Sequence, residues 1–386
     1  MRVSHVITRL IVGGAQENTA STVLGLSEKP DVQVELISGP SSKSEGTLEG
    51  AFDAHPGVLR ILPSLVRPVD LWNDLKATRQ LARDYRKSRP DIVHTHSGKA
   101  GVVGRLAARL AGVKCIVHTI HGPSFGPFQS AGANFVYRNA ERFVGPFTTH
   151  FISVAQAMTD QYLAAGIGRP EQYTRIFSGF PLDPFLSVKR DEAMRAKLGI
   201  APSEFVITKL ARLFESKGHD DLFDAAPQIV KAIPNAKFLL IGEGPWREKF
   251  EQRAKTPELK GRVIFAGLVA PADVPKYLGA TDVVVHLSYR EGLPRAVSQS
   301  AAAGLPVIAY DCDGAKEVCL DGQNGFIIAQ RDLAALTERL ARLAGHPALR
   351  DKFGQTGREF VRENFGVQKM VDEIYALYRR LLGARS

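Results

Sequence analysis

Two cations in the second half of the chain have the spacing of an anion-binding site. Arg212 ends a short apolar run, and Lys217 follows five residues later, where a helical pattern begins. Together with the free N–H groups of a helix N-terminus, two such cations can hold a diphosphate and neutralise the charge on a departing nucleotide. Taken alone, the two residues are better explained as solvated surface charges.

A carboxylate and an amide stand eight residues apart further along the chain. Glu291 follows an expected strand, Gly292 lets the chain turn closely, and Gln299 lies on the helical segment that begins there. A carboxylate in this place can accept hydrogen bonds from sugar hydroxyls, and the amide points toward roughly the same region. The simpler alternative for Glu291 is an acidic residue that interacts favourably with the dipole of the following helix.

The segments around these residues predict the elements that position them. Strands are expected at Val3–Thr8, Val34–Ser38, Asp91–His96, Cys115–His121, His150–Val154, Phe205–Ala211, Phe238–Gly242, Val263–Gly267, Val283–Leu287 and Val307–Tyr310. Helices are expected at Leu71–Lys87, Lys99–Leu110 and Asn134–Phe143, and between positions 222 and 230. This alternation predicts parallel sheets covered on both faces. Such sheets bind ligands at the carboxyl ends of their strands.

The length of 386 residues, of which 44% are hydrophobic and 23% charged, predicts two domains. Two blocks of alternation of similar size predict two doubly wound α/β domains that face each other. Ser178–Leu186, with one glycine and two prolines, is the expected linker. A last helical pattern, Val367–Leu382, lies beyond the second block.

The composition indicates where the protein is located, but it does not identify the partners of the protein. The net charge of +10 is compatible with phosphates, anionic lipid or nucleic acid. The chain has no run of about 18 apolar residues, so no transmembrane helix is expected. The N-terminal segment, interrupted by Arg9, is expected to be a strand rather than a signal peptide. Because three cysteines are too few for a disulfide framework, we expect a cytoplasmic protein with reduced thiols.

The second half of the chain resembles the donor-binding signature of glycosyltransferase family 4, whose members are retaining enzymes with the GT-B fold. That signature has an Arg-x4-Lys pair and a Glu-x7-Glu motif followed by Gly-x-Pro-Val. Here Arg212 and Lys217 form the pair, and Glu291-x7-Gln299 is followed by Gly304-Leu-Pro-Val307. Two further matches stand at the right spacing, namely Ile241-Gly-Glu-Gly-Pro-Trp246 and Val263-Ile-Phe-Ala-Gly267. Each match alone is weak, but five in order are specific.

The first half resembles the same family more loosely. Gly13 and Gly14 follow the first expected strand, where the family has a glycine-rich loop whose backbone can approach a phosphate or the reacting sugar. A simple strand-to-helix turn is the alternative. Segments 91–101 and 118–122 are similar to bacterial capsule, exopolysaccharide and O-antigen transferases. The resemblance therefore covers nearly the whole chain.

The resemblance implies a role for each matching residue. Arg212 and Lys217 would hold the diphosphate and stabilise its leaving charge, and Glu291 would contact the transferred sugar. Position 299 would hold the ribose hydroxyls, and His121 would lie beside the sugar. The residues implied to bind the donor are Gly13, Gly14, Arg212, Lys217, Leu268, Glu291, Gly292, Leu293 and Gln299; those implied to act in catalysis are His121, Arg212, Lys217 and Glu291. The chain near Leu268 would meet the base.

The chain departs from the family pattern at Gln299, where the second Glu of the motif is expected. An amide still bonds ribose hydroxyls but loses the charge-assisted part of the interaction. We expect this departure to weaken or retune nucleotide binding without abolishing the chemistry, because Glu291 is retained.

For the whole chain, the resemblance implies the GT-B fold, with two Rossmann-like doubly wound domains around a central cleft. Residues 1–180 would bind the acceptor, residues 181–366 the nucleotide-sugar, and residues 367–386 would form a helix that crosses back to the first domain. The implied reaction transfers a hexose with retention from a UDP-sugar to a saccharide or lipid-linked acceptor in cell-surface polysaccharide synthesis. It needs neither metal nor other cofactor. Attachment to the inner face of the cytoplasmic membrane would suit such an acceptor, and no nucleic-acid partner is expected.

Two other functions stay open. One is a non-catalytic GT-B subunit that binds a nucleotide-sugar or a partner, which Gln299 alone supports. The other is a sugar-nucleotide epimerase, which can share this fold.

Three further patterns carry weaker signals. His94 and His96 have a spacing that a metal could use, but no Cys or carboxylate cluster joins them, so no metal site is expected. Segment 242–247 begins like a dinucleotide fingerprint but lacks its third glycine. The helical segment Leu71–Arg89 carries six cations interleaved with Trp72, Leu75 and Tyr85, which indicates either an anionic membrane surface or a solvated helix face.

Overall fold

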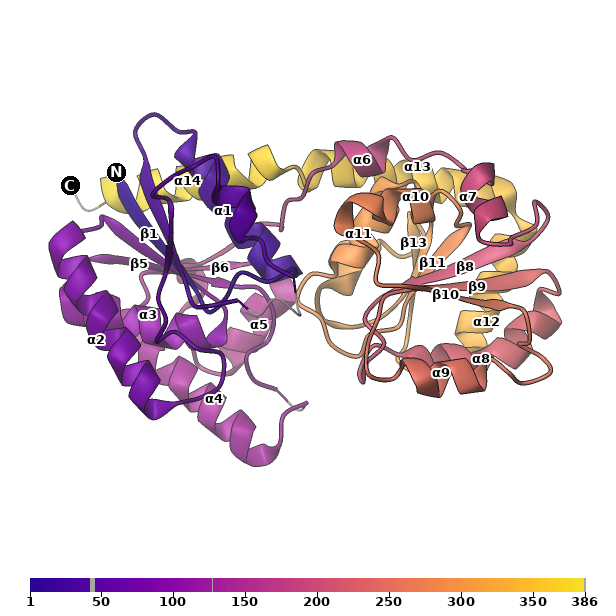
Figure 1. Ribbon diagram of the computed structural model, residues 1–386, viewed down its shortest axis with the longest axis horizontal. Helices are drawn as coiled ribbons and strands as arrows, with labels where there is room; N and C mark the ends of the chain where they lie inside the picture. The colour runs from indigo at the N-terminus through magenta and orange to yellow at the C-terminus, as the bar shows by residue number, and fades with distance from the viewer. Residues whose placement is uncertain (42–45, 127, 385–386) are drawn as a thin grey trace. The chain divides into compact units, whose positions relative to one another are not determined.

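The computed structural model describes residues 1–41, 46–126 and 128–384, which form two compact units (Figure 1). The N-terminal unit comprises Met1–Phe180 together with Gly366–Ser386, and the C-terminal unit comprises Pro181–Phe365. Each unit contains one sheet, and the strand pairs of both sheets are parallel. The predicted α/β class with two doubly wound sheets is thus confirmed.

The sheet of the N-terminal unit has seven strands in the order β3-β2-β1-β4-β5-β6-β7. Their bounds are β1 Arg2–Ile7, β2 Gln33–Ser38, β3 Leu59–Ile61, β4 Ile92–His96, β5 Cys115–Ile120, β6 His150–Ser153 and β7 Tyr173–Arg175. The order reverses between β1 and β4, which pair in parallel. In open α/β sheets a ligand crevice lies at this kind of switch point, beyond the carboxyl ends of the strands.

Helices cover both faces of this sheet, with α1 and α14 on one face and α2, α3 and α4 on the other (Figure 1). Their bounds are α1 Gly14–Ser27, α2 Leu71–Ser88, α3 Gly98–Ala111, α4 Ala131–Val144, α5 Gln156–Ala164 and α14 Val367–Gly383. The last helix packs Met370, Val371 and Ile374 into the same apolar cluster as Val3 and Ile92. Residues from both ends of the chain therefore build one core.

The structure corrects the predicted surface of helix α2. Trp72 is 83% exposed and Leu75 is 41% exposed, but Tyr85 is buried. Tyr85 lies four residues after Leu81 on the stripe that faces the sheet, and it packs into the apolar core there. Tyr85 therefore belongs to the core rather than to a membrane-facing surface.

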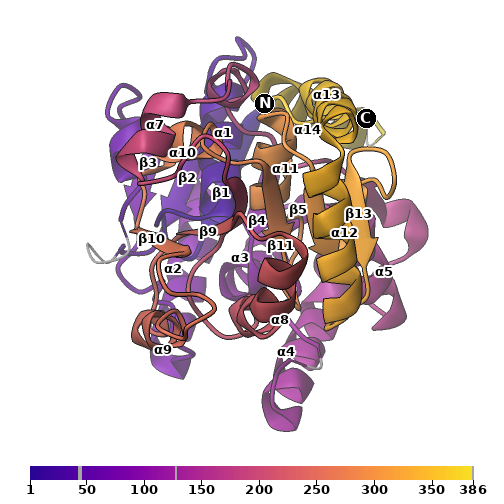
Figure 2. The ribbon, with the colours of Figure 1, turned by 90° about the vertical axis from the view of Figure 1, so that its right-hand side faces the viewer.

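The sheet of the C-terminal unit has six strands in the order β10-β9-β8-β11-β12-β13. Their bounds are β8 Phe205–Leu210, β9 Ala236–Ile241, β10 Val263–Gly267, β11 Val283–His286, β12 Val307–Tyr310 and β13 Gly325–Ile328. The helices are α6 Asp183–Leu186, α7 Glu192–Lys197, α8 His219–Ala232, α9 Arg247–Arg253, α10 Val274–Leu278, α11 Arg295–Ala302, α12 Leu333–Gly345 and α13 Pro347–Asn364. Helices α8 and α12 lie side by side on one face (Figure 2). The switch point of this sheet falls between β8 and β11.

Three short strands were not predicted, namely β3, β7 and β13. Each has three or four residues and each ends a sheet. A strand this short has no readable period, and its pairing depends on a neighbour that is distant in sequence. Short helical turns at Glu49–Phe52, Gly145–Phe147, Pro170–Gln172, Pro271–Asp273 and Asp313–Glu317 complete the elements.

The N-terminal segment forms strand β1, as predicted. Cys115, Cys312 and Cys319 are buried as free thiols. Among the helices of the described ranges, none is long and apolar enough to cross a bilayer.

Candidate functional site

One predicted diphosphate residue and the predicted sugar residue of the C-terminal unit meet at its switch point. Strands β8 and β11 pair in parallel, so the loops that follow them leave the sheet at the same edge. Lys217, after β8, and Glu291, after β11, form an ion pair with an Nζ···Oε1 distance of 2.6 Å. Their side chains are 27% and 19% exposed, so the pair is largely but not fully shielded from water. The sequence predicted that each residue lies in an anion- or sugar-binding site, but it did not predict that the two side chains pair with each other.

A glycine at the start of helix α8 makes this pairing possible. Gly218 has a φ of +66°, and a Cβ built on it would lie 1.9 Å from the carbonyl oxygen of Leu287. The start of α8 is therefore pressed against the chain that leaves β11, closer than any other residue would allow. The Tyr289 N–H donates to the Ser216 carbonyl at 2.9 Å and ties the same two loops together.

The loop that carries Arg212 is held from a third segment. Gly242 has a φ of +140°, and its added Cβ would lie 2.2 Å from the Ala211 carbonyl oxygen. The Leu213 N–H donates to the Glu243 carbonyl at 3.2 Å. The Gly-Glu-Gly-Pro-Trp segment thus supports the backbone on either side of Arg212. The Arg212 side chain is exposed, lies over the ring of Phe214, and meets no carboxylate within the described ranges.

The surroundings of Glu291 keep its carboxyl group ionised. Burial by itself would raise the pKa of Glu291, but Lys217, with help from His286 and the Ser288 hydroxyl, brings it below its ordinary value. The Glu291 backbone N–H donates to Asp313 Oδ2 at 2.8 Å, which fixes the loop. The result is an anchored carboxylate that can accept hydrogen bonds from hydroxyl groups.

The sequence analysis missed a group of buried polar side chains next to this pair. Lys209 Nζ and both ring nitrogens of His219 have no hydrogen-bond partner among the described residues. Burial, together with the charge of Lys217, lowers the pKa of Lys209 to about 7. One sign of this group is present in the sequence, because Lys209 is the one charged residue in a strand that is buried on both faces.

The other donor-site candidates of this unit also follow its strands. Gly292 and Leu293 lie between Glu291 and helix α11, where the Gly314 N–H donates to the Gly292 carbonyl at 3.1 Å. Gln299 is half-buried on α11, and its side-chain amide has no hydrogen-bond partner within the ranges that the structure describes. Leu268 follows β10 and is 83% exposed.

The N-terminal unit gathers its own candidates at the β1–β4 switch point. Helix α1 begins at Gly14, and a Cβ built there meets nothing within 4 Å, so the backbone borders open space. Gly13 is the N-cap residue. His121 follows β5, and its Nε2 lies 3.0 Å from His96 Nδ1. The structure also brings His5 to this place, which the spacing of the histidines did not reveal.

Three of these histidines come close enough to be considered as a metal site. One ligand atom from each of His5, His94 and His96 lies within 4.8 Å of the others. However, His5 Nδ1 and His96 Nε2 face each other at 2.9 Å, which is a hydrogen-bond distance. Both ring nitrogens of each of the three histidines have such a partner, so the geometry is that of a hydrogen-bonded cluster.

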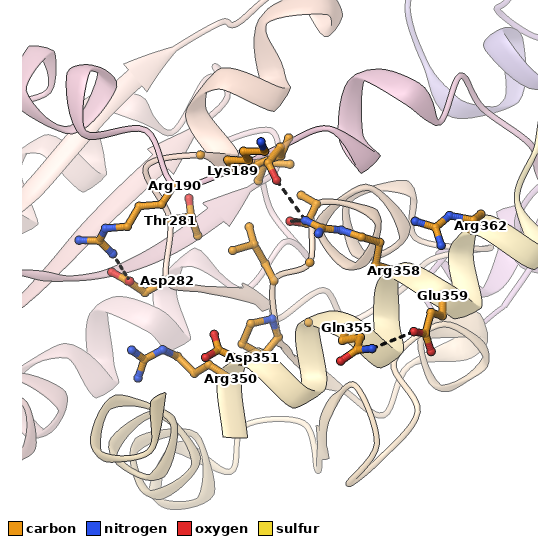
Figure 3. A pocket seen from close by; sticks show the side chains of 18 residues that line it. Lys189, Arg190, Thr281, Asp282, Arg350, Asp351, Gln355, Arg358, Glu359 and Arg362 are labelled. Carbon is orange, nitrogen blue, oxygen red and sulfur yellow. Dashed lines mark hydrogen bonds and ion pairs between the residues drawn. The ribbon is translucent and has the colours of Figure 1, made fainter. Parts of the chain in front are cut away.

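A hollow of about 610 Å³ lies at the other end of the C-terminal sheet (Figure 3). Thr281 and Asp282, which border it, directly precede β11, whereas Glu291 follows that strand. The hollow therefore lies at the end of the sheet opposite to Glu291. Two of its arginines are engaged: Arg190 pairs with Asp282 at 3.0 Å, and Arg358 donates to three backbone carbonyls. These arginines hold the local structure together.

Two protein families match the chain, one in each half. The family described as glycosyl transferases group 1 matches residues 190–360. The glycosyl transferase 4-like domain matches residues 13–178. The first match contains Arg212, Lys217 and Glu291, and the second contains Gly13, Gly14 and His121.

Similar proteins of known name extend these matches over the full length. The chain is 30% identical to the UDP-Gal:alpha-D-GlcNAc-diphosphoundecaprenol alpha-1,3-galactosyltransferase of Escherichia coli, over 98% of this chain and 96% of that protein. It is also 30% identical to the putative glycosyltransferase EpsD of Bacillus subtilis, over 82% and 83% of the two chains. Among solved structures, Anabaena Alr3699/HepE in complex with UDP superposes with a TM-score of 0.81 at 21% identity, over 98% of this chain and 99% of that one.

Proposed function

Since the chain belongs to the glycosyltransferases, as a GT-B member of the family 4 type, we propose that it transfers a hexose from a UDP-sugar to a lipid-linked saccharide with retention of configuration. The observation that carries this proposal is the position of Arg212, Lys217 and Glu291 at the switch point of the C-terminal sheet. Two cations and one carboxylate in this place suit a ligand with a diphosphate at one end and hydroxyl groups at the other.

In this proposal each half of the chain binds one of the two substrates. The C-terminal unit binds the donor: Arg212 and Lys217 contact the diphosphate, Glu291 contacts the sugar, and Gln299 contacts the ribose. Backbone groups at 292–293 assist Glu291, and Leu268 offers its exposed apolar side chain to the base. The N-terminal unit binds the acceptor and contributes the open backbone at 13–14 and the ring of His121.

In the proposed reaction the bond between the anomeric carbon and the diphosphate oxygen breaks while the acceptor oxygen bonds to the same face of the sugar. The acceptor proton passes to the departing diphosphate, so UDP leaves and no covalent sugar–enzyme bond is needed. Lys217 and Arg212 stabilise the negative charge that grows on the diphosphate. Before the donor arrives, Glu291 holds the Lys217 ammonium in place at 2.6 Å.

The name of the Escherichia coli relative suggests the acceptor and donor to try first. That protein is named for transfer from UDP-Gal to alpha-D-GlcNAc-diphosphoundecaprenol. We therefore propose a saccharide linked to a polyprenyl diphosphate as acceptor for this chain, and UDP-galactose and UDP-glucose as the first donors to test.

The experiment that tests this function also tests its dependence on metal. The purified chain is incubated with each UDP-hexose and GlcNAc-diphosphoundecaprenol, and the product is analysed by mass spectrometry and by NMR of the new anomeric centre. We expect an α-linked product at an undiminished rate in excess EDTA, because two cations supply the charge that a metal would supply. Loss of activity that Mg²⁺ or Mn²⁺ restores would contradict the metal-independent mechanism.

The same assay separates the two other functions. A β-linked product would contradict retention. Conversion of the UDP-hexose to its epimer without acceptor would identify an epimerase, and tight UDP binding without any transfer across the donor panel would identify a non-catalytic subunit.

A second prediction concerns Gln299. The substitution Gln299→Glu is expected to keep or improve the affinity for UDP and the UDP-sugar, by about 1 kcal/mol, because a carboxylate accepts both ribose hydroxyl protons in charge-assisted bonds. Calorimetric titration of both proteins measures the difference. Gln355→Glu is the matched control, because Gln355 lies on α13 beside the hollow at the other end of the sheet. A clear loss of affinity for both ligands in Gln299→Glu alone would show that position 299 does not bind ribose.

A third prediction concerns the membrane. Leu71 and Trp72 at the start of α2 are 81% and 83% exposed, and Phe135 and Phe143 on α4 are 63% and 62% exposed. The exposed face of α2 also carries five cations, namely Lys76, Arg79, Arg83, Arg86 and Lys87. Exposed aromatic side chains beside cations suit the surface of an anionic bilayer. We propose that this part of the N-terminal unit lies on such a surface.

The protein is therefore expected to sediment with anionic vesicles at low salt and to leave them as salt rises. Each cation near the surface contributes about 1 kcal/mol, which salt screens. Trp72→Ser should weaken the association, whereas Leu268→Ser, at an equally exposed apolar residue of the C-terminal unit, should not. Equal sedimentation with neutral and anionic vesicles would rule out the proposed surface.

A further inference from the structure

Four histidines of the N-terminal unit belong to one hydrogen-bonded chain that begins at His121. His121 Nε2 lies 3.0 Å from His96 Nδ1, and His96 Nε2 lies 2.9 Å from His5 Nδ1. The ring centroids of these two pairs are 5.3 and 5.2 Å apart, and the rings are inclined by only 26° and 15°. These centroid distances are close to the N···N distance plus two ring radii, which is the largest value that a bonded pair of rings can have. Each bond therefore runs nearly along the line that joins its two rings.

The chain continues into the last helix through a tyrosine. The Tyr378 hydroxyl lies 3.3 Å from His5 Nε2 and 2.5 Å from His94 Nδ1. His94 Nε2 lies 2.6 Å from the Thr119 hydroxyl, where the chain ends. At the other end, His121 Nδ1 is the single ring nitrogen of the chain that has no hydrogen-bond partner within residues 1–41, 46–126 and 128–384.

All four imidazoles are neutral near pH 7. Burial lowers the pKa of His5 and of His121 to about 3, and it lowers the pKa of His94 and of His96 well below the ordinary value. A neutral imidazole carries one N–H and one bare nitrogen. Where both nitrogens of a ring are hydrogen-bonded to neighbours, one nitrogen must donate and the other must accept. The N–H groups along the chain must therefore all point in the same direction.

The phenol of Tyr378 decides that direction. An O–H donor makes shorter hydrogen bonds than an N–H donor, which assigns the phenol proton to the 2.5 Å contact with His94 rather than to the 3.3 Å contact with His5. The Thr119 hydroxyl competes for His94, but a phenol is the more acidic group and the stronger donor. Tyr378 then accepts from His5 Nε2–H, His5 Nδ1 accepts from His96 Nε2–H, and the His94 Nε2–H donates to Thr119.

We propose that Tyr378 is a positioning residue that holds His121, through His5 and His96, as the Nε2–H tautomer, so that the bare Nδ1 accepts a hydrogen bond from a hydroxyl group of the transferred sugar. The inference rests on the proposed function, because it takes His121 to lie beside that sugar. A neutral acceptor orients the hydroxyl without adding a positive charge near a sugar ring that itself becomes positive in the transition state.

The tautomer of His121 is measured directly in the full chain. Long-range ¹H–¹⁵N correlation spectra of the histidine-labelled protein distinguish the protonated ring nitrogen from the bare one, and His121→Gln identifies the signals of His121. We expect the Nε2–H form in the wild-type protein and a mixture of both tautomers in Tyr378→Phe. Tyr375→Phe is the matched control, since it removes a hydroxyl from the same helix that bonds Asp31 at the surface at 2.8 Å. This control should keep the wild-type spectrum.

Kinetics supply the second measurement. Tyr378→Phe is expected to lower kcat by about three- to tenfold, which corresponds to one hydrogen bond, with little change in KM for the donor. His5→Phe, which interrupts the chain but leaves Tyr378 in place, should give the same tautomer mixture and the same loss. Tyr375→Phe should retain the wild-type rate.

Two results would overturn the inference. One is a wild-type His121 that carries its proton on Nδ1, and the other is an unchanged His121 tautomer in both Tyr378→Phe and His5→Phe. A wild-type protein that transfers no sugar contradicts the proposed function instead, and the spectra of that same protein still decide the tautomer.

Discussion

Arg212→Ala and Lys217→Ala are each expected to lower the rate of sugar transfer by a factor of a few hundred. Each substitution removes one cation that stabilises the charge on the departing diphosphate, and the loss of one such contact typically costs about 3–4 kcal/mol at the transition state. The fold should remain, because Arg212 is exposed and Lys217 is 27% exposed. The measurement is kcat/KM for transfer, together with the thermal unfolding curve of each variant.

Lys217→Ala has a second consequence that must be separated from the first. It removes the partner of Glu291, so part of any loss comes from a shielded carboxylate left unpaired. The double variant Lys217→Ala with Glu291→Gln neutralises that carboxylate. If Lys217 acts on the diphosphate, the double variant stays as slow as Lys217→Ala or becomes slower.

A control keeps the electrostatic interpretation specific. Lys231→Ala removes an exposed cation from the last turn of α8, the helix that begins beside Lys217. It is expected to retain wild-type activity. Near-normal turnover by both Arg212→Ala and Lys217→Ala would refute their assignment to the diphosphate.

The largest expected effect on stability comes from a buried ion pair in the N-terminal unit. Arg105 on α3 and Glu141 on α4 are joined at 2.5 Å, with side-chain exposures of 0% and 2%. Arg105 also donates to the Gly101 carbonyl at 2.8 Å and to the Thr148 hydroxyl at 3.3 Å. Glu141→Gln leaves the guanidinium buried without a compensating charge, which typically costs about 3–5 kcal/mol. Urea unfolding of the variant measures the loss of unfolding free energy.

Two further variants show whether the buried charge is the cause. Replacing both partners, as Arg105→Met with Glu141→Leu, should recover much of the stability, because well-packed apolar side chains of similar volume can substitute for a buried pair. Glu171→Gln breaks the exposed pair with Arg169, whose side chains are 71% and 66% exposed, and should leave the transition unchanged. An unchanged urea midpoint in Glu141→Gln would show that the pair does not stabilise the unit.

The sequence by itself determined the class of the fold and the types of residue at its strand ends. Alternating strand and helix patterns are local features, and each pattern is contained in about 20 consecutive residues. The strands that carry the site were predicted for that reason, as were the positions of Arg212, Lys217 and Glu291 beyond them. The resemblance to a known family then gave these residues their expected roles.

Only the tertiary structure decided which strands are neighbours. Strand β8 pairs with β11 and β1 pairs with β4, although other strands separate them in the sequence. This order brings Lys217 against Glu291 across 74 positions, aided by the backbone contact at Gly218. Neither the strand order nor the contact at Gly218 produces a periodic pattern of residues from which it could be predicted.

The histidine chain depends on tertiary structure still more. His5 lies on β1, His96 lies on β4, His121 directly follows β5, and Tyr378 comes from the last helix. In the sequence, His94 and His96 were readable as a pair with metal-like spacing, whereas His5 and Tyr378 gave no sign of belonging with them. A hydrogen bond needs two atoms within about 3 Å of each other. For segments more than 280 residues apart, sheet order and helix packing alone set that distance.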